Sequence, residues 1–482
     1  MGHVLFFVTL IAYSTALYDN CHMTMSIEKT NHLRGKKFCV VTLGCRVNHY
    51  ESEAIASMLE NRGAFLVAGE SEGTGDERVD IVVVVTCSVT SVADAKTRKT
   101  LRRYRRRNPG SLIVACGCWV QGTDAEEAKS SADILVGNRV KERIADEIEY
   151  WYESPGVARS NRIDLSECHE WDHLSLDRPR MNTRAFLKVQ EGCDRRCSYC
   201  AVSSLRGVSV SRDFDDAVAE AARIVAGGTS EIILTGVQLG GYESSGATLA
   251  DLVAGISRVP GLKRLRLGSV EPFSLTGELM AAMRDSETFC PHLHLPLQSG
   301  DNGVLGAMRR GYSASDFTEA VAMTKQYLGD DVHISTDLIV GFPGENEAAF
   351  ERSLSLLESL ALGKIHVFPY SPRSGTDSAA MERLPPVVVS ERTDRALALA
   401  DKLLSEYAAR MVGRADSVLV ENAGRGTASG WSRHYLRVYL QASDTRKNLI
   451  GNEFSVCPKI SIGSILLCEG VDKEKIIIDP DE

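Results

Sequence analysis

The sequence predicts an α/β protein in three parts: an N-terminal doubly wound parallel α/β domain, a central partial (β/α)6 barrel and a small C-terminal all-β barrel. Three observations support this prediction. Apolar runs of strand length alternate with helical patterns from residue 37 to about residue 411, and such alternation is typical of parallel sheets. A polar stretch at residues 153–182 divides the alternation in two. Beyond residue 411 only short strand-like runs between turns follow.

The bulk composition limits the class of protein. At 482 residues the chain is longer than a single hydrophobic core usually serves, since single cores stop growing near roughly 250–300 residues. The net charge of −9 excludes a nucleic-acid binder that works by bulk charge, so any such site must be a local basic patch. Thirteen cysteines in so long a chain indicate metal-binding or catalytic thiols rather than a disulfide framework. We therefore expect a reducing, cytoplasmic location.

Residues 1–36 are expected to be a leader or a misassigned start. The stretch 4–17 is apolar, but it is too short to span a bilayer and has no basic segment before it. Met23 and Met25 follow closely and offer later start positions. We expect no association with a membrane.

The first domain is expected to span residues 37–152. Its predicted buried strands read KFCVVTLG, DIVVVVT, SLIVA and DILVG. Helical patterns lie between them at residues 50–63, 89–107, 124–131 and 140–152. Strands that alternate with helices in this way favour a doubly wound parallel sheet. Residues 153–182 are polar and irregular and are interpreted as a linker.

The second domain is expected at residues 183–411, where longer strand–helix units follow one another. Six such units suit a partial or open version of a β/α barrel. The predicted strands lie at 185–190, 231–236, 264–269, 292–297, 334–341 and 364–370, and a long helix follows at 390–411. Residues 412–475 then show four short strands between turns, which indicate a small β-barrel.

Cys193, Cys197 and Cys200 have the spacing C-x3-C-x2-C directly after the first predicted barrel strand, at the face where β/α barrels carry their chemistry. Iron–sulfur cubes are usually held by four thiolates. Three protein ligands leave one iron open, as an open position distinguishes a catalytic zinc from a structural one. The alternative is a zinc site completed by Cys168 or His173, but the spacing matches the paired C-x2-C zinc pattern poorly.

Three more cysteines hold equivalent positions in the first domain. Cys45, Cys87 and Cys118 each lie just past the carboxyl end of a predicted parallel strand, where open α/β sheets bind ligands. Since neighbouring strands are about 4.8 Å apart, we expect the three thiols to converge on one cube. Cys116 competes for the third place, but we favour Cys118, because Gly117 breaks the strand and leaves the next residue projecting from its end.

The C-x3-C-x2-C motif resembles the radical S-adenosylmethionine (SAM) enzymes. The stretches LGCRVNHYESE, VVTCSVT and ACGCWVQ resemble the methylthiotransferase branch of that superfamily. LTGVQLGGY, SVEP, HLPLQSGDNGVLGAMRRGY, DLIVGFPGE and FPYSPRSGT extend the resemblance from about residue 37 to about residue 472. One departure stands in the loop after the second trio of cysteines, where Ser203 replaces the family's usual proline.

The resemblance implies a three-cysteine domain, a radical SAM barrel and a C-terminal RNA-binding barrel called TRAM, with two 4Fe-4S clusters and SAM as cofactors. The cube on the second trio would bind SAM and cleave it to a radical that abstracts hydrogen from an unactivated adenine C–H, a reactivity that belongs to the cofactor. The cube on the first trio would hold the sulfur that is methylated and transferred. The implied partners are tRNA, an electron donor such as flavodoxin or ferredoxin, and a sulfur source.

Candidate SAM-binding residues stand at the ends of predicted barrel strands. Glycines there permit close backbone approach to a ligand, and amide or hydroxyl groups hold its polar atoms; ordinary turn residues are the alternative. The candidates are Thr235, Gly236 and Gln238 after the second strand and Gln298, Ser299 and Gly300 after the fourth. Asp337, inside the fifth strand, faces either the barrel interior or a neighbouring group.

The first candidate RNA contact is KTRKTLRRYRRRNPG, residues 96–110. Lys99, Arg102, Arg103 and Arg106 recur at helical spacing and share one face. A run of eight basic residues in twelve without an acidic one favours phosphate contact, and the alternative is a merely solvated face.

The second candidate RNA contact is SGWSRHYLRVYL, where Trp431, Arg433 and Tyr435 interleave aromatic and basic side chains. Such residues can stack bases and hold phosphates. The stretch resembles the GYT-x-NY segment of TRAM domains, with Trp431 and His434 in place of the usual tyrosine and asparagine. The alternative is a hairpin with aromatic packing across its strands.

The resemblance includes three branches, which act on threonylcarbamoyladenosine in tRNA, on isopentenyladenosine in tRNA, or on an aspartate of a ribosomal protein. Residues 44–48 (GCRVN) and 368–376 (FPYSPRSGT) resemble the first branch most closely. We therefore expect a tRNA (N6-L-threonylcarbamoyladenosine-C2)-methylthiotransferase that acts beside the anticodon. The alternatives are the other two branches and, from a different class, a non-catalytic RNA-binding protein whose metals brace the fold.

Overall fold

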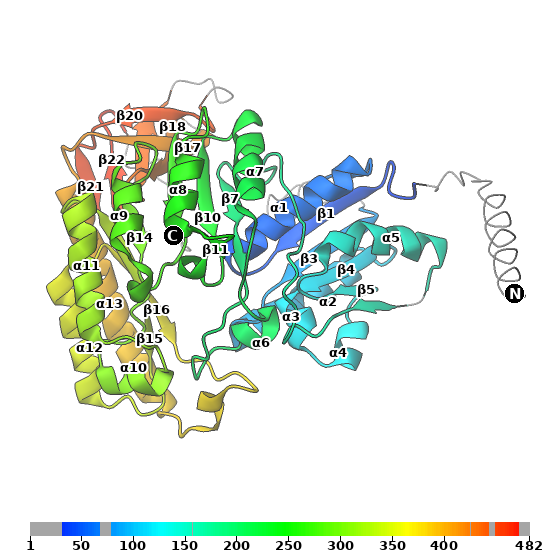
Figure 1. Ribbon diagram of the computed structural model, residues 1–482, viewed down its shortest axis with the longest axis horizontal. Helices are drawn as coiled ribbons and strands as arrows, with labels where there is room; N and C mark the ends of the chain where they lie inside the picture. The colour runs from blue at the N-terminus through cyan, green and yellow to red at the C-terminus, as the bar shows by residue number, and fades with distance from the viewer. Residues whose placement is uncertain (1–30, 68–78, 157, 425, 443–448, 472–482) are drawn as a thin grey trace, which may run out of the picture.

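The computed structural model describes residues 31–67, 79–156, 158–424, 426–442 and 449–471. They form the three parts that the sequence predicts, and the α/β fold class is confirmed (Figure 1). Most of the expected leader, including Cys21, and residues 472–475 lie outside the described residues. No helix in these ranges is long and apolar enough to cross a membrane.

The N-terminal part is an all-parallel sheet in the order β2-β1-β3-β4-β5-β6, with helices on both faces. Its strands are β1 (Lys37–Thr42), β2 (Phe65–Leu66), β3 (Ile81–Thr86), β4 (Leu112–Gly117), β5 (Ile134–Val136) and β6 (Arg159–Asn161). Its helices are α1 (Arg46–Asn61), α2 (Ser91–Arg107), α3 (Cys118–Gly122), α4 (Ala125–Lys129), η2 (Lys141–Arg143) and α5 (Ile144–Glu153). The strand order reverses between β1 and β3, and ligands of such sheets bind beyond the carboxyl ends of the strands at that point.

The predicted linker is part of the fold. Its β6 extends the sheet beside β5. Leu174 and Leu176 are buried in the main core, and the Leu174 carbonyl accepts a 2.7 Å hydrogen bond from the Tyr50 hydroxyl of α1. The sequence pattern did not indicate this role because β6 has three residues and the two leucines stand singly among polar neighbours.

The central part is an open barrel of six parallel strands in two hydrogen-bonded groups, β7-β10-β13 and β14-β15-β16, joined by a parallel bridge between Ser269 and His294. The strands are β7 (Ala185–Lys188), β10 (Glu231–Thr235), β13 (Arg264–Leu267), β14 (His292–His294), β15 (His333–Val340) and β16 (Lys364–Pro369). The main helices, which lie outside the strands, are α7 (Phe214–Ala226), α8 (Leu249–Ser257), α9 (Gly277–Arg284), α11 (Ala314–Leu328), α12 (Glu347–Leu360) and α13 (Pro386–Arg410) (Figure 1).

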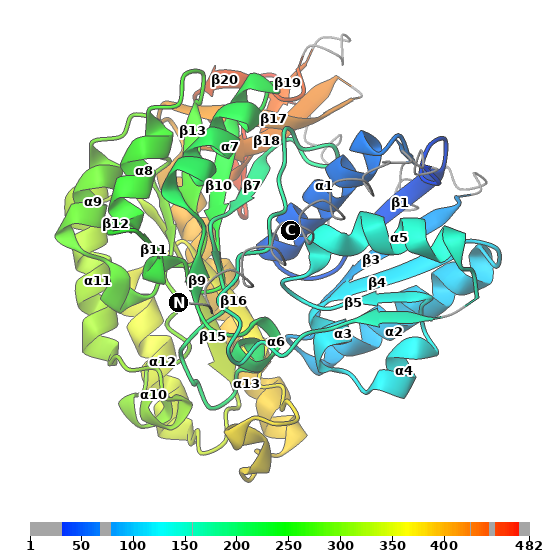
Figure 2. The same cartoon turned by 45° about the vertical axis from the view of Figure 1, so that its right-hand side comes forward.

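Shorter elements shape the loops of the barrel. They are β8 (Gln190–Glu191), α6 (Val202–Arg206), β9 (Val210–Ser211), η3 (Leu239–Gly241), β11 (Glu243–Ser244), β12 (Ala247–Thr248), η4 (Pro272–Ser274), α10 (Asn302–Met308) and η5 (Asp377–Ala380). The N-terminal domain lies against the open side of the barrel, where α1 packs on β7 and α3 packs on α6 (Figure 2). This places the carboxyl ends of both parallel sheets around one space.

The C-terminal part is a single sheet of six strands in the order β20-β17-β18-β19-β22-β21. The strands are β17 (Asp416–Gly424), β18 (Thr427–Ser432), β19 (Arg437–Gln441), β20 (Glu453–Val456), β21 (Ile460–Ile462) and β22 (Ile465–Leu467). Four were predicted; β18 was missed because TASGWS lacks an apolar run, and β21 was missed because it has three residues. Arg264 and Arg266 of β13 donate to the carbonyls of Trp431, Ser432 and Arg433, so this sheet docks near the amino ends of the barrel strands.

Candidate functional site

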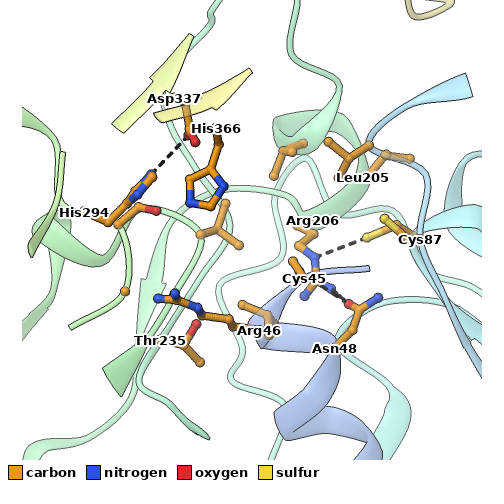
Figure 3. A pocket seen from close by; sticks show the side chains of 18 of the residues that line it. Cys45, Arg46, Asn48, Cys87, Leu205, Arg206, Thr235, His294, Asp337 and His366 are labelled. Carbon is orange, nitrogen blue, oxygen red and sulfur yellow. Dashed lines mark hydrogen bonds and ion pairs between the residues drawn. The ribbon is translucent and has the colours of Figure 1, made fainter. Parts of the chain in front are cut away.

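The three N-terminal thiols come together at one cavity. Cys45 caps the start of α1, Cys87 follows β3, and Cys118 begins α3. All three line a cavity of about 540 Å³ (Figure 3). Gly44 shows how closely the strand ends approach, because it has a φ of +100° and a β-carbon there would come 2.6 Å from Cys87 Sγ. The arrangement therefore presents three thiols to one ligand.

The geometry favours Cys118 over Cys116. Cys116 is fully buried in β4, within the hydrophobic core, and burial raises the pKa of its thiol to about 12. Gly117 then turns the chain with a φ of +101°, so that Cys118 lines the cavity.

Donors from both domains surround Cys118. Arg206 Nε donates to Cys118 Sγ at 3.2 Å, and Asn138 Nδ2 lies 3.6 Å from the same sulfur. Hydrogen bonds to a ligating sulfur orient it and tune a bound metal. Burial raises the pKa of the Cys87 thiol to about 11, so metal binding at this trio must displace a proton.

Arg206 also belongs to a buried ionic network that joins the two domains. Its Nη1 lies 3.1 Å from Glu51 of α1 and 2.6 Å from Glu191 of β8. Lys141 and Lys188 pair with Glu51 at 3.1 and 3.4 Å. Burial disfavours the charged form of Glu51, but the three cations outweigh it and hold the pKa of that carboxyl at about 2. All five side chains are at most 3% exposed, so each depends on its partners.

The second trio of thiols lies on the loop between β8 and α6. Each sulfur has a polar neighbour from the surrounding chain. Gln238 Oε1 accepts from Cys193 Sγ at 3.3 Å, Arg310 Nη1 donates to Cys197 Sγ at 3.3 Å, and the Val202 N–H donates to Cys200 Sγ at 3.4 Å. Burial raises the pKa of Cys193 to about 12. Ser203 lies within α6, so this helix forms without the proline usual in the family.

Each donor set consists of three thiols. In the described ranges no group of three or more His, Cys, Asp or Glu side chains is arranged to hold one metal ion. Cys168 and His173, which the zinc alternative requires, are among the described residues that form no such group. A cube of four irons is larger than one ion and takes thiolate ligands that stand further apart, and trios of soft thiolates suit it chemically.

The predicted SAM contacts after β10 lie at the site. Thr235 and Gly236 line the cavity, and Gln238 contacts Cys193 of the second trio. A β-carbon on Gly236 would come 2.8 Å from the side chain of Gln190, so the glycine allows the loop to close over β8.

The predicted contacts after β14 have a different setting. The Gly300 N–H donates to Ser353 Oγ at 2.8 Å, and a β-carbon on Gly300 would come 2.6 Å from the Ser353 backbone. Ser299 Oγ lies 3.4 Å from the same hydroxyl. These two residues therefore pack the loop against α12, and their contact with SAM stays a prediction. Gln298 has a φ of +69°, a strained conformation for a non-glycine residue.

A His–Asp–His group in the cavity was not foreseen. His294 of β14, Asp337 of β15 and His366 of β16 line the cavity together, which answers the open question about Asp337. His294 Nε2 lies 3.2 Å from the Asp337 carboxylate (Figure 3). Burial opposes ionisation of Asp337, but the two imidazoles outweigh it and lower its pKa. Burial also lowers the pKa of His366 to about 4. The sequence feature that could have indicated this group is the alternation of histidine with apolar residues in HLHL and KIHVF.

The basic face of α2 is exposed as predicted from its spacing. Lys99, Arg102, Arg103 and Arg106 are all exposed. Arg98 and Arg105, on another side of the helix, pair with Glu127 at 3.5 Å and with Asp133 at 2.8 Å. α2 begins shortly after Cys87, and these four exposed cations lie in the second half of the helix.

Trp431, Arg433 and Tyr435 dock the C-terminal sheet on the barrel, which differs from the predicted RNA contact. Arg433 donates to the carbonyls of Lys263, Glu287 and Phe289 at 2.7–3.2 Å. The Trp431 and Tyr435 rings stack with centroids 4.9 Å apart, and Tyr435 also packs 4.5 Å from the His292 ring. The three side chains are partly buried in these contacts, and their RNA contact stays a prediction.

Two family models match this chain. The radical SAM superfamily model matches residues 187–357, and the model described as uncharacterized protein family UPF0004 matches residues 37–137. The first contains the C-x3-C-x2-C loop and most of the barrel. The second contains Cys45, Cys87 and Cys118.

Several relatives are similar over most of the chain. A threonylcarbamoyladenosine tRNA methylthiotransferase, MtaB, from Bacillus subtilis is 34% identical over 84% of this chain and 90% of its own. The protein of the same name from Thermotoga maritima is 33% identical over 83% and 90%. A tRNA-2-methylthio-N(6)-dimethylallyladenosine synthase from Cereibacter sphaeroides is 34% identical over 84% and 92%.

Among solved structures, the radical SAM methyltransferase TsrM from Kitasatospora setae, with cobalamin and a [4Fe-4S] cluster bound, has a TM-score of 0.54. It is 13% identical, over 82% of this chain and 80% of its own. At this identity the similarity concerns the fold alone.

Proposed function

The chain belongs to the radical SAM tRNA methylthiotransferases, and we propose that its substrate is N6-threonylcarbamoyladenosine beside the tRNA anticodon, converted to the 2-methylthio derivative. Relatives named for this substrate match most of the chain. Relatives named for dimethylallyladenosine are equally identical, so identity alone does not choose between them. The choice rests on residues 44–48 and 368–376, which resemble the first branch.

One observation carries the catalytic part of the proposal. Three thiols from the ends of β1, β3 and β4 open into the same cavity as residues at the carboxyl ends of the barrel strands. A transfer of sulfur to a substrate activated in the barrel requires this meeting of two domains. A purely structural metal site has no need of a shared cavity.

An iron–sulfur cluster and SAM are cofactors of this family. We assign two 4Fe-4S clusters, one to Cys45, Cys87 and Cys118 and one to Cys193, Cys197 and Cys200, with Thr235, Gly236 and Gln238 beside the SAM site. When bound, these cofactors supply hydrogen-atom abstraction from an unactivated adenine C–H and a methylated sulfur for transfer.

The protein's own residues prepare the site for this chemistry. Arg206 and Asn138 donate to Cys118 and orient it. The buried network around Glu51 fixes the N-terminal domain against the barrel, so that the two trios keep their relative positions. On the barrel wall, the Asp337 carboxylate and the His366 imidazole offer acceptors to a nucleoside in the cavity. The enclosing walls limit water around the reacting atoms.

Substrate tRNA is proposed to lie along the exposed cations of α2, Lys99, Arg102, Arg103 and Arg106. The domain limits 37–152, 183–411 and 412–475 are retained as a proposal, with an RNA-binding, TRAM-like role for surfaces of the last domain other than its docking hairpin. A low-potential electron donor such as flavodoxin or ferredoxin, a sulfur source and a cytoplasmic location complete the proposal.

Mass spectrometry of tRNA nucleosides from cells lacking this gene tests the substrate. We expect the 2-methylthio derivative of threonylcarbamoyladenosine to disappear and its precursor to accumulate, and the wild-type gene on a plasmid to restore it. Loss of the methylthio group from isopentenyladenosine instead would assign the chain to the other tRNA branch. Unchanged nucleosides in a strain without a second such enzyme would refute the proposed substrate.

A further inference from the structure

Arg46 places a positive charge in the cavity. It follows Cys45 in the first turn of α1 and lines the cavity. Figure 3 shows its guanidinium reaching away from Cys45 toward Thr235 on the barrel side. Among the residues that the structure describes, nothing forms a hydrogen bond or an ion pair with this side chain. Its charge acts across the cavity, since it adds to the effect of burial in lowering the pKa of His366.

The other charges that line the cavity are matched. Arg206 has Glu51 and Glu191 as close partners, and Asp337 has His294. Within the described part of the chain, Arg46 is therefore the arginine of the cavity lining that has no carboxylate partner. A partly enclosed guanidinium of this kind favours a ligand that carries a planar anionic group, because its fork of N–H donors matches a carboxylate bidentately.

The candidate nucleosides differ in such a group. In threonylcarbamoyladenosine, threonine is attached through its amino nitrogen, so its carboxylate is free and negatively charged. An isopentenyl group is a neutral hydrocarbon. Both leave the adenine itself uncharged, so a carboxylate in the cavity distinguishes the first substrate from the second.

We propose that Arg46 binds the carboxylate of the threonylcarbamoyl group and thereby selects this nucleoside over isopentenyladenosine. This inference rests on the proposed function and adds the residue that recognises the threonylcarbamoyl group of the nucleoside. Because its guanidinium reaches toward Thr235, the bound carboxylate would lie on the barrel side of the cavity, across from the first trio of thiols. The cavity volume of about 540 Å³ lies in the range of ordinary ligand pockets.

Equilibrium binding of anticodon stem-loop RNAs to the full-length, cluster-reconstituted protein tests the inference. Fluorescence anisotropy at one salt concentration, without reductant, compares loops that carry threonylcarbamoyladenosine, its methyl ester, or isopentenyladenosine. We expect the wild-type protein to bind the free acid about tenfold or more tightly than the ester, the range for one charge-assisted contact. Arg46→Gln should bind acid and ester equally, and Arg46→Lys should keep part of the preference, because it retains the charge but not the fork.

The control variant is Arg258→Gln, which removes an exposed arginine at the end of α8 and should keep the wild-type ratio. A preference for the acid that survives in Arg46→Gln overturns the inference and leaves the proposed function intact. Equal weakening of all three loops in Arg46→Gln also overturns it and identifies a backbone phosphate as the ligand. A loss of SAM affinity with an unchanged acid-to-ester ratio overturns it in favour of SAM. Failure of the proposed function itself is read separately, from the nucleosides of the deletion strain.

Discussion

Arg206 is the residue at which the two domains and one cysteine trio meet. Replacing it with alanine removes partners from Glu51 and Glu191 while both carboxylates stay buried. We expect Arg206→Ala to lower the free energy of unfolding by about 3–5 kcal/mol, the range for breaking a buried ion pair. Urea denaturation of the metal-free chain measures this effect without any contribution from a cluster.

Arg62→Ala is the matched control for Arg206→Ala. Arg62 pairs with Asp146 at 2.8 Å, but their side chains are 43% and 68% exposed. Its loss should therefore cost less than about 1 kcal/mol. Equal destabilisation by the two variants would show that the buried network does not hold the domains together.

Cys116 and Cys118 are two residues apart and allow a matched test of the first trio. We expect Cys118→Ser to lose about half of the iron and labile sulfide that the anaerobically reconstituted wild-type chain holds, because one of two cubes loses a ligand. Cys116→Ser should retain both, but should unfold more easily because it places a hydroxyl in the core. The opposite pattern of iron content would exchange the two assignments.

At the residue scale, the six cysteines could be singled out as candidate ligands because their spacing and their positions after apolar runs can be read directly from the sequence. Arg206, Glu51 and Lys188 could not, since their pairing joins residues far apart in the chain. The docking role of Arg433 was hidden for the same reason, because a basic residue beside aromatics looks alike whether it faces RNA or a neighbouring domain.

At the element scale, the apolar runs identified all six barrel strands and four of the six parallel strands of the first domain, since buried parallel strands are continuously apolar. The three-residue β6 and the six-residue β18 lack an apolar run and therefore carry little local signal. The long basic pattern of α2 was also visible. The helical spacing of its basic residues indicated which of them share the exposed face.

The basic face of α2 gives a prediction for RNA binding. Replacing Lys99, Arg102 and Arg106 together with alanine should weaken tRNA binding uniformly across sequences. It should also reduce the slope of log K against log salt by about 0.7–0.9 for each RNA phosphate that these cations neutralise in the wild-type complex. The matched control replaces Arg98 and Arg105 of the same helix, which pair with Glu127 and Asp133. An equal change of slope in the control would indicate a general charge effect instead.

The packing of β15 on α13 gives a prediction for pH. His333 stacks on Tyr407 with ring centroids 4.5 Å apart, and its Nδ1 lies 2.7 Å from the His434 carbonyl. Burial lowers the pKa of His333 to about 3. Below about pH 6.5 this imidazole therefore binds a proton in the unfolded chain but not in the folded chain. Stability from this residue is full above pH 6.5 and decreases as the pH falls toward 3.

Between pH 7 and pH 5 the loss should be about 2 kcal/mol for a group with this shift. Chemical denaturation at the two pH values should therefore show a smaller difference for His333→Phe than for the wild-type chain. His169→Phe, which changes an exposed histidine, is the control and should keep the wild-type difference. If the free energy of unfolding of His333→Phe changed between pH 7 and pH 5 as much as that of the wild-type chain, His333 would not be the source of the pH dependence.

At the scale of the whole molecule, the two ends of the barrel have separate tasks. The carboxyl ends of the strands face the N-terminal domain and form the cavity with its thiols. The amino-end side meets the C-terminal sheet through Arg264 and Arg266, whose guanidinium groups reach carbonyls of the β18–β19 hairpin. The order of the three domains was predictable from the sequence. Their contacts were not, because they arise from single polar side chains rather than from a repeating pattern.

Replacing Arg433 distinguishes a role in docking the C-terminal sheet on the barrel from a role in binding tRNA. If it docks the C-terminal sheet, Arg433→Ala removes donors from the carbonyls of Lys263, Glu287 and Phe289. Hydrogen bonds to a charged group contribute about 1.5–3 kcal/mol, which corresponds to a fall in Tm of roughly 3–10 °C for domains of this size. The salt slope of tRNA binding should stay at its wild-type value, because the number of neutralised phosphates does not change. An unchanged Tm together with a reduced salt slope would return Arg433 to the RNA-binding surface and assign the hairpin to the tRNA rather than to the barrel.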